Sequence, residues 1–311
     1  MSSIIDILDI SYHKWCKIKS ILNKLSDPQK TQLERFSMGV SIVGDYAEKT
    51  NIFQHFHKFE KDFKDSSKSI KESFEMINSI RKSQETPEFR VKLNVTFHDS
   101  LYIYSIVDEN GEELEFFTVS HKRISYLLKK FAKDGVSMDT VDRRIAACLL
   151  QYSFFGDLKR HLCFSSEYVQ SLQKDGYTVE AFASPFAFQL GLFDSNAIFC
   201  SAIPETDLLL GSKGSFTSAD INYTGLKTYV HPPRIVEIVD TIFAKILNEL
   251  NSTKCEFTII LYNDTPMNTV MEFFGNFLKK VQKLQVYSEN PFTDAVMKSE
   301  MKCWAYTVST L

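Results

Sequence analysis

At residues 176–185 the chain reads Gly176-Tyr177-Thr178-Val179-Glu180-Ala181-Phe182-Ala183-Ser184-Pro185. The β-branched and apolar residues after the glycine predict a short strand, Thr178–Phe182, and the small and rigid residues that follow predict a tight turn. Such a turn lets a ligand approach the backbone closely. In open α/β sheets, ligands bind beyond the carboxyl ends of the strands. This stretch therefore predicts both a strand and the edge of the sheet where a site would lie.

The rest of the chain after residue 136 alternates between helical and strand patterns. We expect helices at Asp139–Phe155, Ser166–Lys174, Ile235–Leu250 and Thr269–Val281. We expect strands near Leu208–Leu210 and at Thr228–Val230, Phe257–Tyr262, Leu284–Tyr287 and Cys303–Val308. Strands joined by crossover helices form a mostly parallel sheet with helices on both faces. The sequence therefore predicts an α/β domain over residues 136–311.

The first 135 residues follow different periods. Apolar residues at three- and four-residue intervals predict helices up to about residue 85, including a phenylalanine-rich segment from Phe53 to Phe74. From Arg90 the period changes to two, which predicts a small β-hairpin or meander with strands at Leu101–Val107 and Leu114–Val119. A helix follows at Lys122–Lys133. Residues 1–135 are therefore predicted to be a helical region with a small β element.

The composition excludes several classes of protein. The 36 basic and 39 acidic residues give a net charge of −3, so a nucleic-acid partner would need a local basic patch. No apolar stretch has the length of a membrane span, and the N-terminus lacks the basic start of a signal peptide. The cysteines lie far apart, which favours free thiols in a reducing, intracellular compartment over a zinc site or disulfides. They are Cys16, Cys148, Cys163, Cys200, Cys255 and Cys303.

Three segments are expected at carboxyl ends of strands. They are Phe182-Ala183-Ser184-Pro185, Gly211-Ser212-Lys213-Gly214 and His231-Pro232-Pro233-Arg234. Each segment taken alone is weak evidence for a site, because such turns more often only connect two elements than form a binding site. Asp194 and Asp207 are candidates for an acid that binds a ribose, and Asp207 is the better one because it lies in the block Cys200–Asp207, which belongs to the succession described next.

The order of these segments is more specific than any one of them. After Ser184-Pro185 come Cys200–Asp207, then Gly211–Phe216, then His231-Pro232-Pro233. This succession resembles the phosphorylated-C-terminal-domain-interacting factor family, the cap-specific adenosine N6-methyltransferases. The resemblance covers roughly residues 140–265 and includes no WW-type module. A final antiparallel strand, as expected at Cys303–Val308, is typical of class I methyltransferases.

The resemblance implies a class I (Rossmann-like) methyltransferase fold and a function. Members methylate N6 of the adenosine next to the mRNA cap and use S-adenosyl-L-methionine as cofactor. By this resemblance the cofactor-binding residues are Phe182, Ala183, Ser184, Pro185, Asp207, Gly211 and Ser212. The catalytic residues are His231, Pro232, Pro233 and Arg234. Capped RNA is the implied partner, and the N-terminal helices offer a surface for a protein partner. No membrane is expected to be involved. The implied location is nuclear, and the cytoplasm is also compatible.

The sequence also departs from the family pattern. The family's tetrapeptide is Asn-Pro-Pro-Phe, in which the first side chain accepts a hydrogen bond from the adenine amino group and the aromatic residue stacks on the base. Here His231 and Arg234 occupy these positions, and Ala187, Leu208 and Lys213 are further departures. A neutral His231 can accept that hydrogen bond, and its ordinary pKa near 6.5 predicts that turnover falls below that pH.

Two functions follow from the departures. The first is an active, retuned RNA adenosine N6-methyltransferase. The second is a catalytically degenerate methyltransferase-fold protein that serves as an RNA-binding or partner-binding subunit.

Overall fold

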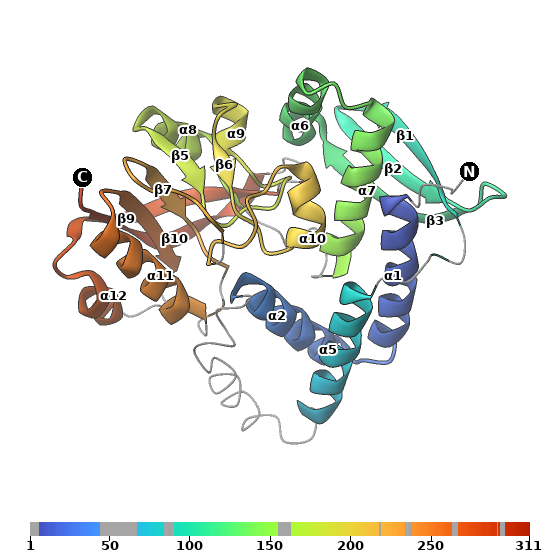
Figure 1. The fold of residues 1–311 in the computed structure, drawn as a ribbon, viewed down its shortest axis with the longest axis horizontal. Helices are drawn as coiled ribbons and strands as arrows, with labels where there is room; N and C mark the ends of the chain where they lie inside the picture. The colour runs from blue at the N-terminus through green and yellow to red at the C-terminus, as the bar shows by residue number, and fades with distance from the viewer. Residues whose placement is uncertain are drawn as a thin grey trace. The chain divides into compact units, whose positions relative to one another are not determined.

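The structure is a computed structural model, and it describes residues 6–43, 67–83, 87, 90–154, 163–217, 219–233, 235, 238–262, 267–290, 292 and 296–311. The chain divides into two compact units, one of residues 1–38 and 53–161 and the other of residues 39–52 and 162–311 (Figure 1). None of the helices in these described ranges is both long and apolar enough to cross a membrane.

The first unit combines helices with a three-stranded antiparallel sheet. Its helices are α1 (Ile7–Leu22), α5 (Ser67–Lys82), α6 (His121–Lys133) and α7 (Met138–Phe154), and α2 (Asp27–Val43) begins in it. Its strands are β1 (Lys92–His98), β2 (Leu101–Val107) and β3 (Glu113–Ser120), in the order β1-β2-β3. The helices, the small β element and the helix over 122–133 expected from the sequence are present. The phenylalanine-rich segment from Phe53 to Phe63 lies outside the described residues.

Helix α7 belongs to the first unit. It packs along α1, where Arg143 forms an ion pair with Asp6 at 3.2 Å. It also anchors the small sheet, because the Tyr104 hydroxyl donates a hydrogen bond to Asp142 at 3.0 Å. The division between the units therefore falls near residue 161 and not at the 135/136 boundary expected from the sequence.

The second unit is built on a seven-stranded mixed sheet. In chain order the strands are β4 (Cys163–Phe164), β5 (Tyr177–Glu180), β6 (Ile198–Phe199), β7 (Lys227–Val230), β8 (Glu256–Tyr262), β9 (Leu278–Glu289) and β10 (Val296–Ser309). The spatial order is β4-β9-β10-β8-β7-β5-β6. The pairs β6–β5, β5–β7 and β7–β8 are parallel, whereas β10 is antiparallel to β8 and β9, and β4 is antiparallel to β9. The predicted α/β class is confirmed, but the sheet is not mostly parallel as expected, because three of its strand pairs are parallel and three are antiparallel.

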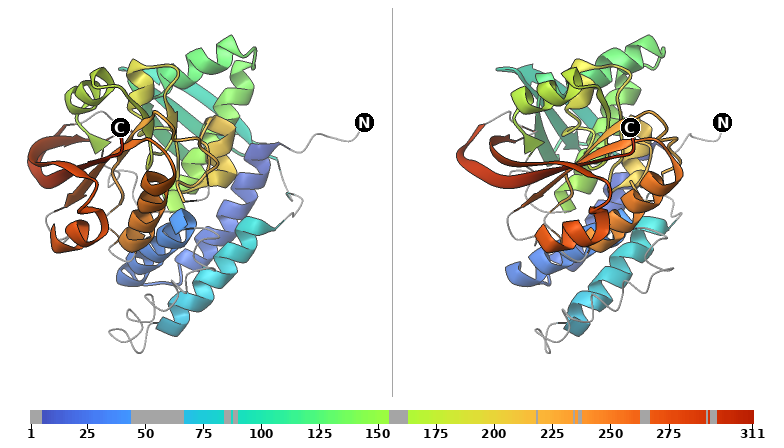
Figure 2. Two further views of the ribbon diagram at one scale, coloured as in Figure 1. Left: turned by 60° about the vertical axis from the view of Figure 1, so that its left-hand side comes forward. Right: turned by 90° about the vertical axis from the view of Figure 1, so that its left-hand side faces the viewer.

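Helices lie on both faces of this sheet. Figures 1 and 2 show α8 (Ser166–Lys174) and α9 (Leu190–Phe193) on one face, and α11 (Val239–Ser252) and α12 (Met267–Phe274) on the other. The short helix α10 (Pro204–Asp207) follows β6. The core is apolar on the α11 side, where Phe257, Ile259 and Phe243 are fully buried.

Two predicted elements in the second unit are wrong. Leu208–Leu210 is a 3-10 turn and not a strand, and the strand beside β5 is Ile198–Phe199. A run of three leucines is too short for periodicity to separate a strand from a helical turn. The helix expected at Thr269–Val281 ends at Phe274, and the next residues enter β9 because pairing with β10 overrides their helical pattern.

Candidate active site at the carboxyl ends of the parallel strands

The segments that follow β5 and β7 leave the sheet side by side. Glu180 pairs with Tyr229 in the parallel ladder, and the Ala181 N–H donates to the Tyr229 carbonyl at 2.9 Å. The Phe-Ala-Ser-Pro segment therefore begins next to the residues 231–233. Two of the three segments expected from the sequence meet at one edge of the sheet.

The glycine turn joins the same edge through β6. The Ala183 N–H donates to the Cys200 carbonyl at 2.9 Å, and the Lys213 N–H donates to the Phe199 carbonyl at 2.8 Å. The Ser201 N–H donates to the Gly214 carbonyl at 2.9 Å. The third segment is thus held beside the first by backbone hydrogen bonds.

The Phe-Ala-Ser-Pro segment is mostly buried. The Ser184 hydroxyl accepts a hydrogen bond from the Ala187 N–H at 3.0 Å, so this side chain stabilises its own turn. Ala183, Ser184 and Pro185 are buried, whereas Phe182 is partly exposed and its ring centre lies 5.3 Å from that of Phe216. Of the four side chains, that of Phe182 is the most accessible to a ligand.

The residues of the glycine turn build its shape. The Ser212 hydroxyl lies 2.7 Å from the Ser201 hydroxyl and accepts the Gly214 N–H at 3.0 Å. Gly211 and Gly214 have φ of 96° and 93°, and a Cβ on Gly214 would meet no atom within 4 Å. Asp207 is fully buried at the end of α10, and its carbonyl accepts the Ser212 N–H at 3.0 Å. The backbone carbonyl of Asp207 therefore holds one end of the glycine turn.

Glu180 is a buried acid at the end of β5 that sequence reasoning missed. Its Oε2 accepts two backbone hydrogen bonds, from the Gln189 N–H at 3.0 Å and the Leu190 N–H at 3.1 Å. These two N–H groups open α9, where a helix leaves its first donors without partners. A charged residue in an otherwise apolar strand is the only signal in the sequence for this role.

His231 follows β7 and lies in an aromatic cluster. Its ring centre is 4.3 Å from that of Phe164, 5.7 Å from Tyr262 and 6.3 Å from Tyr229. Its Nε2 lies 3.1 Å from the Tyr262 hydroxyl. This hydrogen bond fixes the ring orientation and leaves Nδ1 as the second nitrogen of the imidazole.

The aromatic surroundings keep His231 neutral. The ring retains partial exposure, but burial among these groups lowers the pKa of His231 to about 3 because the charged form is poorly solvated there. A decline in turnover through protonation of His231 is therefore expected well below the pH of 6.5 that an ordinary histidine would give.

The two prolines complete the turn after β7. Pro232 is buried and Pro233 is partly exposed. The Pro233 carbonyl accepts the Ile235 N–H at 2.7 Å. Arg234 lies outside the described residues, so its expected stacking role stays a prediction.

The lowered pKa of His231 predicts a pH-dependent stability. Its folded-state pKa of about 3 lies below the unfolded value of about 6.5, so between these pH values only the unfolded chain binds the proton. The free energy of unfolding is therefore expected to fall as the pH falls from about 6.5 towards 3. The slope is at most about 1.4 kcal/mol per pH unit, and smaller because the ring is partly exposed to solvent.

Urea unfolding of wild type and His231→Asn at pH 7 and pH 5 measures this effect. We expect wild type to lose more stability than the variant between the two pH values. Equal losses would contradict the buried, neutral state of His231.

The fold and this edge define an α/β protein with a candidate ligand site at the carboxyl ends of its parallel strands. The sequence model of a family described as phosphorylated CTD interacting factor 1 WW domain matches residues 123–273, which run from α6 to α12. This match supports membership of the phosphorylated CTD interacting factor 1 family. A search of curated proteins finds no match.

Within the described part of the chain, no group of three or more His, Cys, Asp or Glu side chains could hold a metal ion.

Proposed function

We propose that this protein is an S-adenosylmethionine-dependent RNA methyltransferase that acts on N6 of the adenosine next to the mRNA cap. The main support is the arrangement of the β5 and β7 ends. The Phe-Ala-Ser-Pro and His-Pro-Pro segments leave adjacent parallel strands at the same edge, joined by the Ala181–Tyr229 hydrogen bond. A methyl donor held by the first segment and an acceptor base held by the second would then be neighbours.

The sheet and the family give further support. Strand β10 is antiparallel and lies between β8 and β9, and a final antiparallel strand is typical of class I methyltransferases. Membership of the phosphorylated CTD interacting factor 1 family is consistent with cap-related methyl transfer.

The residues at this edge fit the proposed cofactor in two respects. Gly214 faces open space, so its backbone can be approached closely, and the partly exposed Phe182 ring offers a face for an adenine. Asp207 does not offer its carboxylate to a ribose, because it is fully buried. S-adenosylmethionine would supply an electrophilic methyl group. Phe182 and the backbone of residues 183–185 and 211–214 would hold it.

His231 would position the acceptor amine. It is neutral at pH 7, so a ring nitrogen without a proton can accept a hydrogen bond from the adenine N6 amino group. Tyr262 would hold the ring in the required orientation through its hydroxyl. A strong base is not required, because N6 can lose its proton during or after attack on the activated methyl group.

A second function, an RNA-binding or partner-binding subunit without methyl transfer, is favoured by the internal contacts of the site. The Ser184 hydroxyl is occupied by the Ala187 N–H, and His231 Nε2 is occupied by Tyr262. Polar groups that are satisfied internally have less capacity to bind ligands.

Calorimetry with S-adenosylmethionine separates the two functions. If the chain is an enzyme, we expect a micromolar dissociation constant, on the order of −7 to −8 kcal/mol. Phe182→Ala is expected to weaken binding about fivefold, the lower end of the loss of one base–aromatic contact. Phe116→Ala, at an exposed phenylalanine of the first unit, is the matched control and should change nothing.

No heat with either S-adenosylmethionine or S-adenosylhomocysteine would reject the enzyme proposal. A bulky substitution at Ala183 or Ser184 would not test the function, because both side chains are buried and a larger one would disturb packing in either case.

A further inference from the structure

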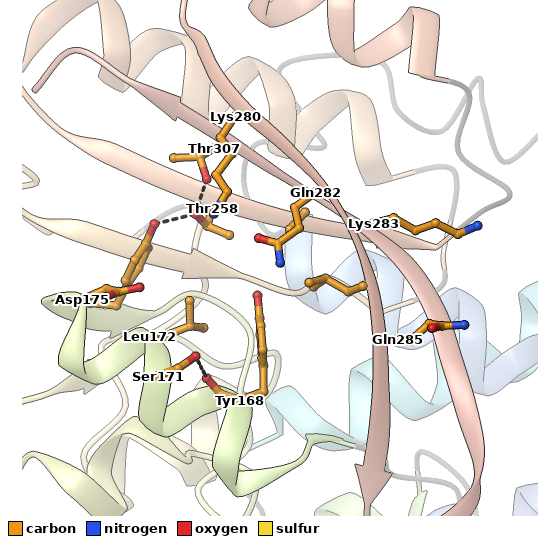
Figure 3. Close-up of a pocket in the computed structure, with 13 residues that line it drawn as sticks. Tyr168, Ser171, Leu172, Asp175, Thr258, Lys280, Gln282, Lys283, Gln285 and Thr307 are labelled. Atoms are coloured by element: carbon orange, nitrogen blue, oxygen red, sulfur yellow. Dashed lines mark hydrogen bonds between the residues drawn. The ribbon is translucent and has the colours of Figure 1, made fainter.

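A polar pocket of about 560 Å³ lies on the face of the second unit's sheet that α8 covers in part. Figure 3 shows α8 on one side, β9 on the other, and the strands β8 and β10 between them. Helix α8 contributes Tyr168, Ser171 and Leu172, with Asp175 just after it. Its volume is that of a small-molecule site. None of the residues that line this pocket is among the site residues predicted from the sequence.

Hydroxyl groups form the floor of this pocket. The Thr258 and Thr307 hydroxyls lie 3.0 Å apart, and the Tyr177 hydroxyl lies 2.5 Å from that of Thr258. Thr258 pairs with Thr307, and Thr307 pairs with Lys280, so the three side chains stand in one row across the sheet. This row places the hydrogen-bonded threonine hydroxyls next to the positively charged Lys280 side chain.

Lys280 and Gln282 face the pocket with unused polar groups. Figure 3 shows both side chains turned towards the pocket, whereas those of Lys283 and Gln285, which also line it, extend away from its centre. This follows the alternation of side chains along a strand. The side chains of Lys280 and Gln282 make no hydrogen bond or ion pair within the described part of the chain. Both are exposed and therefore available to a ligand.

The pocket leads to the His231 end of the sheet. Along β8, Thr258 and Tyr262 are four residues apart, about 13 Å, and both lie on the pocket face. The Tyr168 ring centre lies 5.5 Å from that of Phe164, which lies 4.3 Å from that of His231. A chain of aromatic rings therefore connects the pocket to the candidate acceptor site.

Edge protection explains only part of this arrangement. Lysines often guard the outer strands of sheets against pairing with other chains, and β9 has few partners in β4, which pairs only at Glu289 and Ser288. The outward-turned Lys283 fits that role. The inward-turned Lys280 and Gln282 do not, because they cover the face of the sheet and not its edge.

We propose that this pocket binds the sugar-phosphate backbone of the acceptor RNA, one or two nucleotides away from the base held at His231. Lys280 would contact a phosphate as a point charge, and Gln282 with the threonine hydroxyls would hydrogen-bond sugar or base edges. Asp175 can accept a hydrogen bond from a 2′-hydroxyl or a base amine. This inference rests on the proposed function, because it assumes an RNA acceptor at His231.

Salt-dependent binding of a short fluorescent single-stranded RNA tests the pocket without any methyl transfer. One phosphate contact on a single strand contributes about 0.7 to the slope of log affinity against log salt. Lys280→Gln is expected to lower the slope by about 0.7 and weaken binding about eightfold at 0.05 M salt. Gln282→Glu, which places a negative charge on the same face, should weaken RNA binding more than Lys280→Gln does. Lys279→Gln, an exposed lysine on the same strand that does not line the pocket, is the matched control.

The outcomes separate this proposal from the function on which it rests. Equal slopes for wild type and Lys280→Gln, with wild type bound to RNA, would overturn the pocket proposal and leave the proposed function intact. If wild type binds neither RNA nor S-adenosylmethionine, the pocket proposal and the proposed function are both overturned. An acidic peptide that binds wild type but not Lys280→Gln, while RNA binding is unchanged, would identify a peptide site and overturn the RNA proposal.

Discussion

Replacing His231 with alanine is expected to lower methyl transfer to capped RNA by one to two orders of magnitude. The imidazole is neutral and is held by Tyr262, so it can accept a hydrogen bond from the target amine without prior loss of a proton. Loss of one positioned hydrogen bond in an active site commonly costs about tenfold to several hundredfold in turnover. Transfer of a labelled methyl group measures the effect, with RNA that begins with guanosine as the negative control.

Two companion variants test the role of His231 more closely. His231→Asn should retain or raise activity, because an amide oxygen accepts the same hydrogen bond. Tyr262→Phe removes the hydroxyl that orients the ring and should lower turnover less than His231→Ala does. Equal activity of wild type and His231→Ala would show that His231 has no catalytic role. An inactive wild type with an active His231→Asn variant would favour the binding-subunit function.

Replacing Glu180 with alanine is expected to lower the free energy of unfolding by about 3 kcal/mol. Its carboxylate accepts the N–H groups of Gln189 and Leu190 in a buried setting, so the variant would leave two backbone donors without partners. Urea unfolding followed by circular dichroism measures the change. An alanine variant as stable as wild type would contradict the assigned role.

Glu180→Gln is the matched control for that prediction. Its amide oxygen can still accept a hydrogen bond, but it lacks the charge and one acceptor, so a loss of about half that size is expected. Because Glu180 precedes the Phe-Ala-Ser-Pro segment, both variants should also weaken S-adenosylmethionine binding at temperatures where they remain folded. Weakened binding without any loss of stability would instead point to direct contact with the ligand.

Most periodic elements were predictable because local pattern and final structure agree. The helices α6, α7 and α8 and the strands β2, β7 and β8 lie where the sequence indicates, since their apolar spacing matches the face that each one buries. The short elements were not predictable. The two residues of β6 and the 3-10 turn Leu208–Leu210 are set by pairing with β5 and by the backbone bonds of the glycine turn.

The order of the three strand-end segments is a property of the sequence alone. It indicates the candidate site residues and the family, because the small and rigid residues that form such turns are visible as residue types. The contacts that those residues make are decided by their surroundings. Ser184 caps its own turn and Asp207 supports the glycine turn from a buried position, and neither fact follows from the residue type.

The sequence by itself determined the α/β class, the alternation of elements and the identity of the segments at the strand ends. Only the tertiary structure decided that His231 is neutral, that Glu180 opens α9, and that Lys280 turns inward beside Thr307. The physical reason is the same in each case. A pKa, a buried hydrogen bond and a pocket all depend on groups that are distant in the chain and close in space, whereas periodicity depends on near neighbours alone.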